Sequence, residues 1–186
     1  MPVSKEQAEN VLKRAEVLFD DSAVQAAIDA MAEEIEKELG DKNPLVICVL
    51  TGGIIITSEL LKRLHFPLEI DYLHATRYGD KTVGETLHWY VKPRKALKDR
   101  HILIVDDILD MGHTLAQVVD YCNKQGSAKT YTAVLTDKQH DTPKGFEKAD
   151  FTGLKLPDRY VFGYGMDYKG YWRNLNGIYA ADKDDE

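Results

Sequence analysis

A unit made of an apolar run, a short loop and a helix-like segment occurs twice in this chain of 186 residues. The first unit starts with LVICVL at 45–50, passes through TGG, and continues as IIITSELLKRL at 54–64. The second starts with HILIVDD at 101–107 and passes through a loop at 110–114 into LAQVVDYCNKQG, which YTAVLTD follows. Strands that alternate with helices in this way form a parallel sheet covered on both faces by crossover helices. The sequence therefore predicts an α/β fold in a single domain.

Two helices, over about 5–18 and 22–39, are predicted ahead of these units. The signals are two capping-box pairs and a C-cap glycine: Ser4 with Gln7, Ser22 with Gln25, and Gly40. Further along, the alternating run EIDYLHATRY and the run LHWYV predict two strands. The polar, glycine-bearing segment 79–86 between them predicts a long loop.

The charge balance excludes some classes of partner. The chain has 24 Lys and Arg against 31 Asp and Glu, a net charge of -7, which repels nucleic acid and anionic membranes. We therefore expect no nucleic-acid or membrane partner, and any anionic ligand must be bound by a local site. Without an apolar run suited to a signal peptide or a membrane span, we expect a cytoplasmic protein. Cys48 and Cys122 lack metal-ligand or CxxC spacing and are interpreted as buried free thiols.

The segment ILIVDDILDMGHT at 102–114 places three carboxylates, a glycine and a threonine directly after a predicted strand. Ligands of parallel sheets bind at the carboxyl ends of strands, so Asp106 and Asp107 point toward a candidate site. Adjacent carboxylates bind Mg²⁺ or sugar hydroxyls, and the turn from Asp110 to Thr114 leads into a helix N-terminus whose amides bind phosphate. Each Asp taken alone is better explained as a helix cap. Their combination favours a ligand site.

The same segment resembles the phosphoribosyl pyrophosphate signature of type I phosphoribosyltransferases. From about 45 to 179 the chain resembles the hypoxanthine-guanine branch of that family, through LTGG, TRYGDKT, the DK pair at 137–138 and PDRYVFGYGMDYKGYWRNLNGIY. The chain departs from the family pattern at Met111, where Thr or Ser is frequent, and at His113, where Lys or Leu is frequent. Loss of a hydroxyl at 111 removes one phosphate donor but leaves the backbone amides.

The resemblance implies a particular architecture. We expect a Rossmann-like parallel sheet flanked by helices, with a core over about 40–140. A small hood would be formed by about 1–20 and 145–186. All of it would belong to one phosphoribosyltransferase domain of residues 1–186.

The resemblance also implies which residues hold phosphoribosyl pyrophosphate. The 5'-phosphate would bind to the turn made of Asp110, Met111, Gly112, His113 and Thr114, and the ribose hydroxyls to Asp106 and Asp107. The pyrophosphate would bind to Leu50, Thr51, Gly52, Gly53 and Arg173, in a loop that commonly contains a cis non-proline peptide in this family. Mg²⁺ would be held by Asp106, Asp107 and Asp167. From the residues alone, the glycines at 52 and 53 are equally compatible with a tight strand-to-helix turn.

The purine site implied by the resemblance consists of Lys138, Tyr160, Val161 and Asp167. Lys138 would donate to the exocyclic O6, which selects 6-oxopurines over adenine, and Tyr160 would stack on the base. Asp110 would act as general acid/base at N7. A lone loop lysine is more often exposed, and an aromatic in RYVFGYG also suits a strand core.

Arg77 and Tyr78 stand at the entrance of 79–86, which the resemblance implies is a lid that excludes water. His74, His88, His101 and His140 lack partners at ligand spacing and receive no role. The expected function is purine salvage, in which a 6-oxopurine and phosphoribosyl pyrophosphate give a nucleoside monophosphate in a homodimer or homotetramer. The alternatives are a xanthine-preferring enzyme, a phosphoribosyltransferase-like RNA-binding regulator, and a receiver-type switch. The net charge and Asp110 argue against the regulator, and no isolated phospho-acceptor Asp supports the switch.

Overall fold

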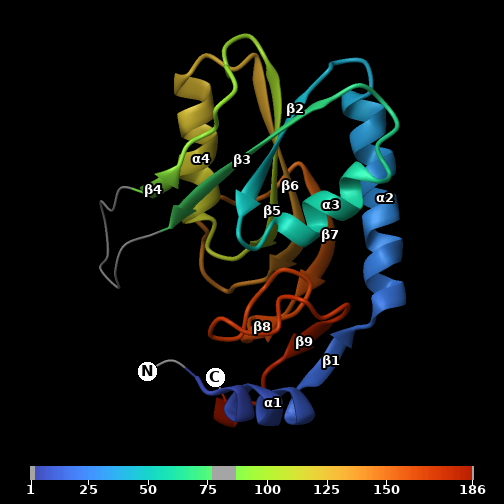
Figure 1. Ribbon diagram of the computed structural model, residues 1–186, viewed down its shortest axis with the longest axis vertical. Coiled ribbons are helices and arrows are strands. Elements are labelled where there is room, and N and C mark those ends of the chain that lie inside the picture. The colour runs from blue at the N-terminus through green and yellow to red at the C-terminus, as the bar shows by residue number, and fades with distance from the viewer. Residues whose placement is uncertain (1–2, 77–86, 186) are drawn as a thin grey trace.

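The computed structural model describes residues 3–76 and 87–185, and its centre is a six-stranded sheet (Figure 1). In the order in which they pair, the strands are β4 (His88–Val91), β3 (Glu69–Thr76), β2 (Leu45–Leu50), β5 (His101–Leu109), β6 (Lys129–Lys138) and β7 (Phe151–Leu156). All neighbours are parallel except β4, which pairs antiparallel with β3 at the edge. The predicted α/β class and the two strands flanking the 79–86 segment are confirmed.

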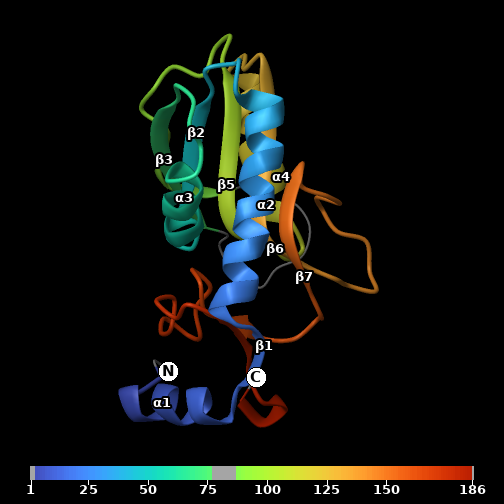
Figure 2. The same cartoon turned by 90° about the vertical axis from the view of Figure 1, so that its right-hand side faces the viewer.

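Helices cover both faces of this sheet, which is why the central strands β2 and β5 begin with continuous apolar runs. The helices are α2 (Asp21–Leu39), α3 (Ile54–Leu61) and α4 (His113–Lys124). On β5, Leu103 and Val105 pack in one core cluster with residues of α2 and α3, whereas Ile102 and Ile104 pack in a second cluster with residues of α4. Figure 2 shows α2 running along the length of the sheet. The side-chain alternation of a single strand thus separates two apolar layers.

The chain ends form a small second layer below the carboxyl ends of the parallel strands (Figure 1). It consists of α1 (Lys5–Arg14), β1 (Glu16–Phe19), β8 (Val161–Phe162), β9 (Ile178–Ala180) and the short 3₁₀ helix at Lys183–Asp185. The strands pair antiparallel in the order β1, β9, β8. We call this layer the hood.

Three expected boundaries are wrong. The first helix ends at Arg14 rather than 18, because residues 16–19 pair with β9, about 160 positions later in the chain. The hood does not begin at 145, because β7 pairs with β6 and belongs to the large sheet. The core also includes α2, which packs on that sheet although it precedes position 40.

The capping signals were confirmed at one helix and wrong at the other. Ser4 and Gln7 form a complete capping box at α1. At α2 the N-cap is Asp20, whose carboxylate accepts a hydrogen bond from the Ala23 amide at 2.9 Å. Since Asp is as good an N-cap as Ser and lies two residues earlier, the helix begins before Ser22.

The connections place a crevice between β2 and β5. From β2 the chain passes through α3 to β3 on one side, and from β5 it passes through α4 to β6 on the other. Neighbouring strands whose connections run in opposite directions leave a gap at their carboxyl ends, where ligands of such sheets bind. Over residues 3–76 and 87–185, the chain forms no helix with the length and apolarity needed to cross a bilayer.

Candidate active site

Two acidic side chains lie at the carboxyl end of β5, beside the crevice. Asp106 accepts a hydrogen bond from the Asp107 amide at 2.9 Å, and the Asp107 carbonyl accepts one from the Thr136 hydroxyl at 3.0 Å. Burial, followed by the charge of Asp107, raises the pKa of Asp106 well above its usual range. Burial also raises the pKa of Asp107. The pair therefore concentrates negative charge where solvent compensates it poorly.

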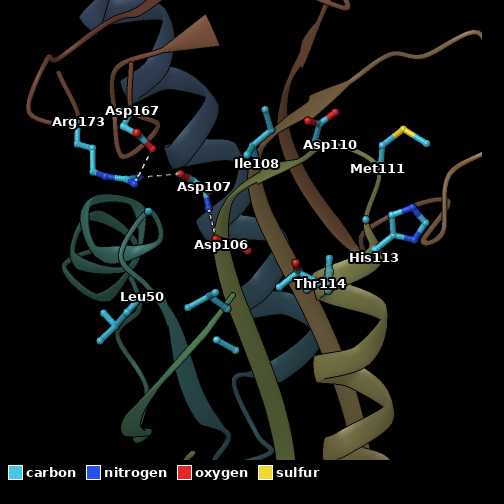
Figure 3. Close-up of a pocket in the computed structure, with 15 residues that line it drawn as sticks. Leu50, Asp106, Asp107, Ile108, Asp110, Met111, His113, Thr114, Asp167 and Arg173 are labelled. Carbon is cyan, nitrogen blue, oxygen red and sulfur yellow. Dashed lines mark hydrogen bonds and ion pairs between the residues drawn. The ribbon is translucent and has the colours of Figure 1, made fainter. Parts of the chain in front are cut away.

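Arg173 connects this pair to the C-terminal segment. Its guanidinium lies 3.9 Å from the Asp107 carboxylate and 2.6 Å from that of Asp167, and it donates to the Gly165 carbonyl at 2.5 Å. Figure 3 shows Arg173 and Asp167 reaching toward Asp107 from the segment that follows β8. Asp107 is thus joined to Asp167 and Arg173, which lie some 60 positions later in the sequence, in one charged cluster.

The loop after β2 lies against the same carboxylates. The peptide between Leu50 and Thr51 is cis, as the family resemblance implied. A Cβ built on Gly52 would lie 2.0 Å from an Asp107 carboxylate oxygen. Only glycine allows this backbone to approach Asp107 so closely. Gly53 is the N-cap residue of α3, so the loop ends at a helix N-terminus.

The turn after β5 also ends at a helix N-terminus, that of α4. Gly112 is the N-cap residue and has φ 74°, a left-handed conformation that favours glycine. The Met111 carbonyl accepts a hydrogen bond from the Gly145 amide at 2.8 Å, so the segment before β7 braces the turn. The Met111 and His113 side chains extend away from the acid pair (Figure 3). The backbone amides and the Thr114 hydroxyl are therefore the groups of this turn that could donate to an anion.

Two adjoining cavities share the end of β5. The first, of about 410 Å³, is lined by Leu50, Gly52, Asp106, Asp107, Asp110, Met111, Gly112, His113, Thr114, Asp167 and Arg173, among others. The second, of about 310 Å³, is lined by Asp107, Ile108, Asp110, Lys138, Tyr160, Val161, Met166 and Asp167. Asp107, Ile108, Asp110 and Asp167 line both. The polar first cavity suits a sugar phosphate, and the second, with its aromatic and apolar walls, suits a planar base.

The residues expected around the base do come together. Lys138 is the last residue of β6, its side chain is only 13% exposed, and its ammonium lies 3.6 Å from the Asp110 carboxylate. Tyr160 packs edge-on against Tyr168 at 5.4 Å between ring centroids, and its hydroxyl accepts a hydrogen bond from the Lys169 amide at 3.3 Å. Lys138 is therefore not the exposed loop lysine that was the simpler alternative.

One residue of this region was missed from the sequence. His140, which received no role, directs its Nε2 at an Asp110 carboxylate oxygen 2.5 Å away and its Nδ1 at an Asp158 carboxylate oxygen 3.0 Å away. The signal available was its position two residues after Lys138, just past the end of β6. A search for metal ligands at short sequence spacing cannot detect this contact, because Asp110 and Asp158 lie in loops other than that of His140.

The donor set fits Mg²⁺ bound jointly with a substrate. The acid pair supplies carboxylate oxygens, the ligand type that Mg²⁺ prefers, and its raised pKa values indicate that it lacks full charge compensation. Within the described ranges, no three His, Cys, Asp or Glu side chains gather closely enough to hold an ion alone. Mg²⁺ is usually bound through one or two carboxylates, water and substrate phosphates, which matches this arrangement.

Arg77, Tyr78 and the segment 79–86 lie outside the described residues. Their assignment to a lid stays a prediction. Thr51 and Gly53 lie in the loop after β2 but are not among the residues that line the two cavities.

A doubly wound sheet with two adjoining cavities at its switch point defines the class of α/β proteins that bind a ligand at the carboxyl ends of their strands. Comparison with known proteins narrows this class. Residues 15–169 match the phosphoribosyl transferase domain family. The chain belongs to that family.

Its relatives agree on a branch. A hypoxanthine-guanine-xanthine phosphoribosyltransferase from Tritrichomonas foetus is 35% identical over 161 residues, which cover 86% of this chain and 87% of that protein. A hypoxanthine-guanine phosphoribosyltransferase from Bacillus subtilis is 33% identical over 86% of this chain and 88% of its own. A crystal structure of a hypoxanthine phosphoribosyltransferase from Staphylococcus aureus superposes with a TM-score of 0.87 at 27% identity, covering 95% of each chain. The resemblance to the hypoxanthine-guanine branch is confirmed.

Proposed function

We propose that this chain transfers the phosphoribosyl group of phosphoribosyl pyrophosphate to N9 of hypoxanthine or guanine. The products are IMP or GMP and pyrophosphate, which makes the reaction one of purine salvage. The observation that carries the proposal is the pair of adjoining cavities with Asp110 on the wall between them. A sugar phosphate in the first cavity and a base in the second would meet beside that carboxylate.

The first cavity has donors at both of its ends. The amides at the N-terminus of α4 face the 5'-phosphate, since helix N-termini bind anions. The loop of residues 50–53 and Arg173 face the pyrophosphate, for which Gly52 leaves the backbone accessible. Asp106 and Asp107 lie between these ends and face the ribose hydroxyls.

Asp110 would accept the proton of N7 as N9 bonds to C1' of the sugar. Positive charge develops on the ribose while the bond to pyrophosphate breaks, and the nearby carboxylates stabilise that charge. Asp106, Asp107 and Asp167 would hold Mg²⁺ together with substrate oxygens, and the ion would compensate the charge on the leaving group. Lys138 donates to O6 of the base, where adenine presents an amino group instead.

Initial rates with hypoxanthine, guanine, xanthine and adenine, at saturating phosphoribosyl pyrophosphate and Mg²⁺, test the proposal. We expect turnover of hypoxanthine or guanine, none of adenine, and loss of activity in excess chelator. Comparable turnover of adenine would contradict the role of Lys138, and full activity in chelator would contradict the metal role. Xanthine is included because the name of the Tritrichomonas foetus relative includes that base. A clear preference for xanthine would replace the proposed substrate pair.

We also propose a cytoplasmic homodimer or homotetramer. Large apolar side chains are exposed on β3 and β4, at Ile70, Tyr72 and Tyr90. These three side chains lie on neighbouring strands, and apolar side chains that gather in one patch mark a protein interface. Light scattering coupled to gel filtration gives the oligomeric state, and cell fractionation gives the location.

A further inference from the structure

His140 is held between two carboxylates that come from different loops. Its Nε2 lies 2.5 Å from Asp110, in the turn after β5, and its Nδ1 lies 3.0 Å from Asp158, in the loop between β7 and β8. The His140 side chain is only 9% exposed, whereas that of Asp110 is 49% exposed. The imidazole is therefore fixed behind a carboxylate that is open to the cavities.

Hydrogen bonding defines the protonation state that this arrangement favours. A carboxylate can only accept, so two carboxylates at the two ring nitrogens require both nitrogens to donate. That form of the ring is the imidazolium cation. The other charged group in contact with this cluster is Lys138, which lies 3.6 Å from Asp110 and 4.0 Å from Asp158.

We propose that His140 is a positioning residue for Asp110. It holds the carboxylate in place, and Asp158 in turn orients the imidazole. This inference rests on the proposed function, in which Asp110 is the base that takes the N7 proton. The arrangement resembles other sites in which an acid orients a histidine, but here the histidine orients the base and does not itself touch the substrate.

Lys138 cannot substitute for His140 in this role. The proposed function directs its ammonium to O6 of the purine, so binding of the base draws Lys138 away from Asp110. Its 3.6 Å separation from Asp110 is already longer than a hydrogen bond. His140 makes the shorter contact and lines neither cavity, so the base leaves that contact in place. Asp110 keeps a fixed partner through the reaction.

The test compares His140→Ala, His140→Gln and Asp158→Asn with wild type, using hypoxanthine and phosphoribosyl pyrophosphate with Mg²⁺. For His140→Ala we expect kcat to fall about 10-fold, within the loss of up to about 10²-fold that misplacing a reacting group causes. KM for phosphoribosyl pyrophosphate should stay within about twofold, because the phosphate turn is unchanged. The acid limb of the kcat–pH profile should move to higher pH, since loss of a neighbouring cation makes a carboxylate easier to protonate. His140→Gln retains one donor and should recover part of kcat without restoring the profile.

Two matched controls are available on the exposed surface, His65→Ala and Asp141→Asn. Both should keep wild-type kcat and pH profile. If His140→Ala fails to fold, His140→Gln and Asp158→Asn carry the same expectation of a shifted acid limb. Wild-type activity with unchanged kcat and pH profile in all three variants would overturn this inference alone. An inactive wild type would overturn the proposed function and this inference with it.

Discussion

Replacing Asp106 by Asn tests whether the acid pair at the end of β5 is maintained at the expense of stability. The Asn side chain keeps an oxygen that can accept the hydrogen bond from the Asp107 amide, at present 2.9 Å long. It removes a carboxylate whose pKa is raised well above its usual range by burial and by the charge of Asp107. We therefore expect Asp106→Asn to raise the free energy of unfolding at pH 8, while it abolishes most activity.

The expected magnitude follows from the buried position of the pair. Relief of burial and like-charge repulsion is worth about 1 to 3 kcal/mol at such a site. For a chain of this size, each kcal/mol shifts Tm by about 2 to 4 °C. Because the folded pKa of Asp106 lies above the unfolded one, ionisation makes the wild type less stable as pH rises through that interval. The difference in Tm between Asp106→Asn and wild type should be small near pH 4. It should increase as pH rises, until the pH exceeds the raised pKa of Asp106.

Thermal unfolding followed by circular dichroism between pH 4 and pH 8.5, without substrate, measures this difference. Asp141→Asn serves as the matched control, since its carboxylate is exposed and its Tm should follow wild type at every pH. A lower Tm for Asp106→Asn than for wild type at pH 8 would refute the reasoning. So would a difference in Tm that does not change with pH.

Three further substitutions test the site and its support. Asp110→Asn should lower kcat by about 10² to 10⁴ with a far smaller change in KM for phosphoribosyl pyrophosphate, measured in the steady state; activity near wild type would mean that Asp110 only shapes the turn. Gly52→Ala places a methyl group 2.0 Å from an Asp107 carboxylate oxygen. It should lower kcat/KM, and it should lower the free energy of unfolding in urea by about 1 to 3 kcal/mol. Unchanged values would show that the loop adjusts freely. Lys144→Met leaves Asp137 without its ion-pair partner, and the two side chains are only 8% and 13% exposed. The substitution should lower the free energy of unfolding by about 3 to 5 kcal/mol. Adding Asp137→Leu in the same chain should restore most of that loss.

The strand and helix units were predictable because each carries its own local signal. The apolar run 45–50 and the run at 102–105 have no polar side to expose, so only a sheet covered on both faces accommodates them. The same logic places the acid pair at the strand end. The pairing of 16–19 with residues 178–180 was not predictable, since four residues with strand propensity give no sign of a partner so distant.

For a related reason, only part of the candidate site could be predicted from the sequence. The turn from Asp110 to Thr114 is continuous in sequence, so a motif could point to it, and all five residues line the first cavity. The contact between His140 and Asp110 depends on where two loops meet at the end of the sheet, and no motif records that meeting. Residues joined through space rather than along the chain need the fold before their roles become visible.

The pairing of β1 with β9 also sets an order in which the molecule can be completed. As the chain leaves the ribosome, the large sheet has all its strands once residue 156 has emerged, and domains fold as their segments become available. β1 emerges among the first residues but has no hydrogen-bonding partner in the hood until residues 178–180 follow. Contacts of such long sequence separation form slowly. Tyr160 and Val161 of the second cavity and Arg173 of the first belong to this late segment. Both cavities are therefore completed last, after the turn at 110–114 already exists.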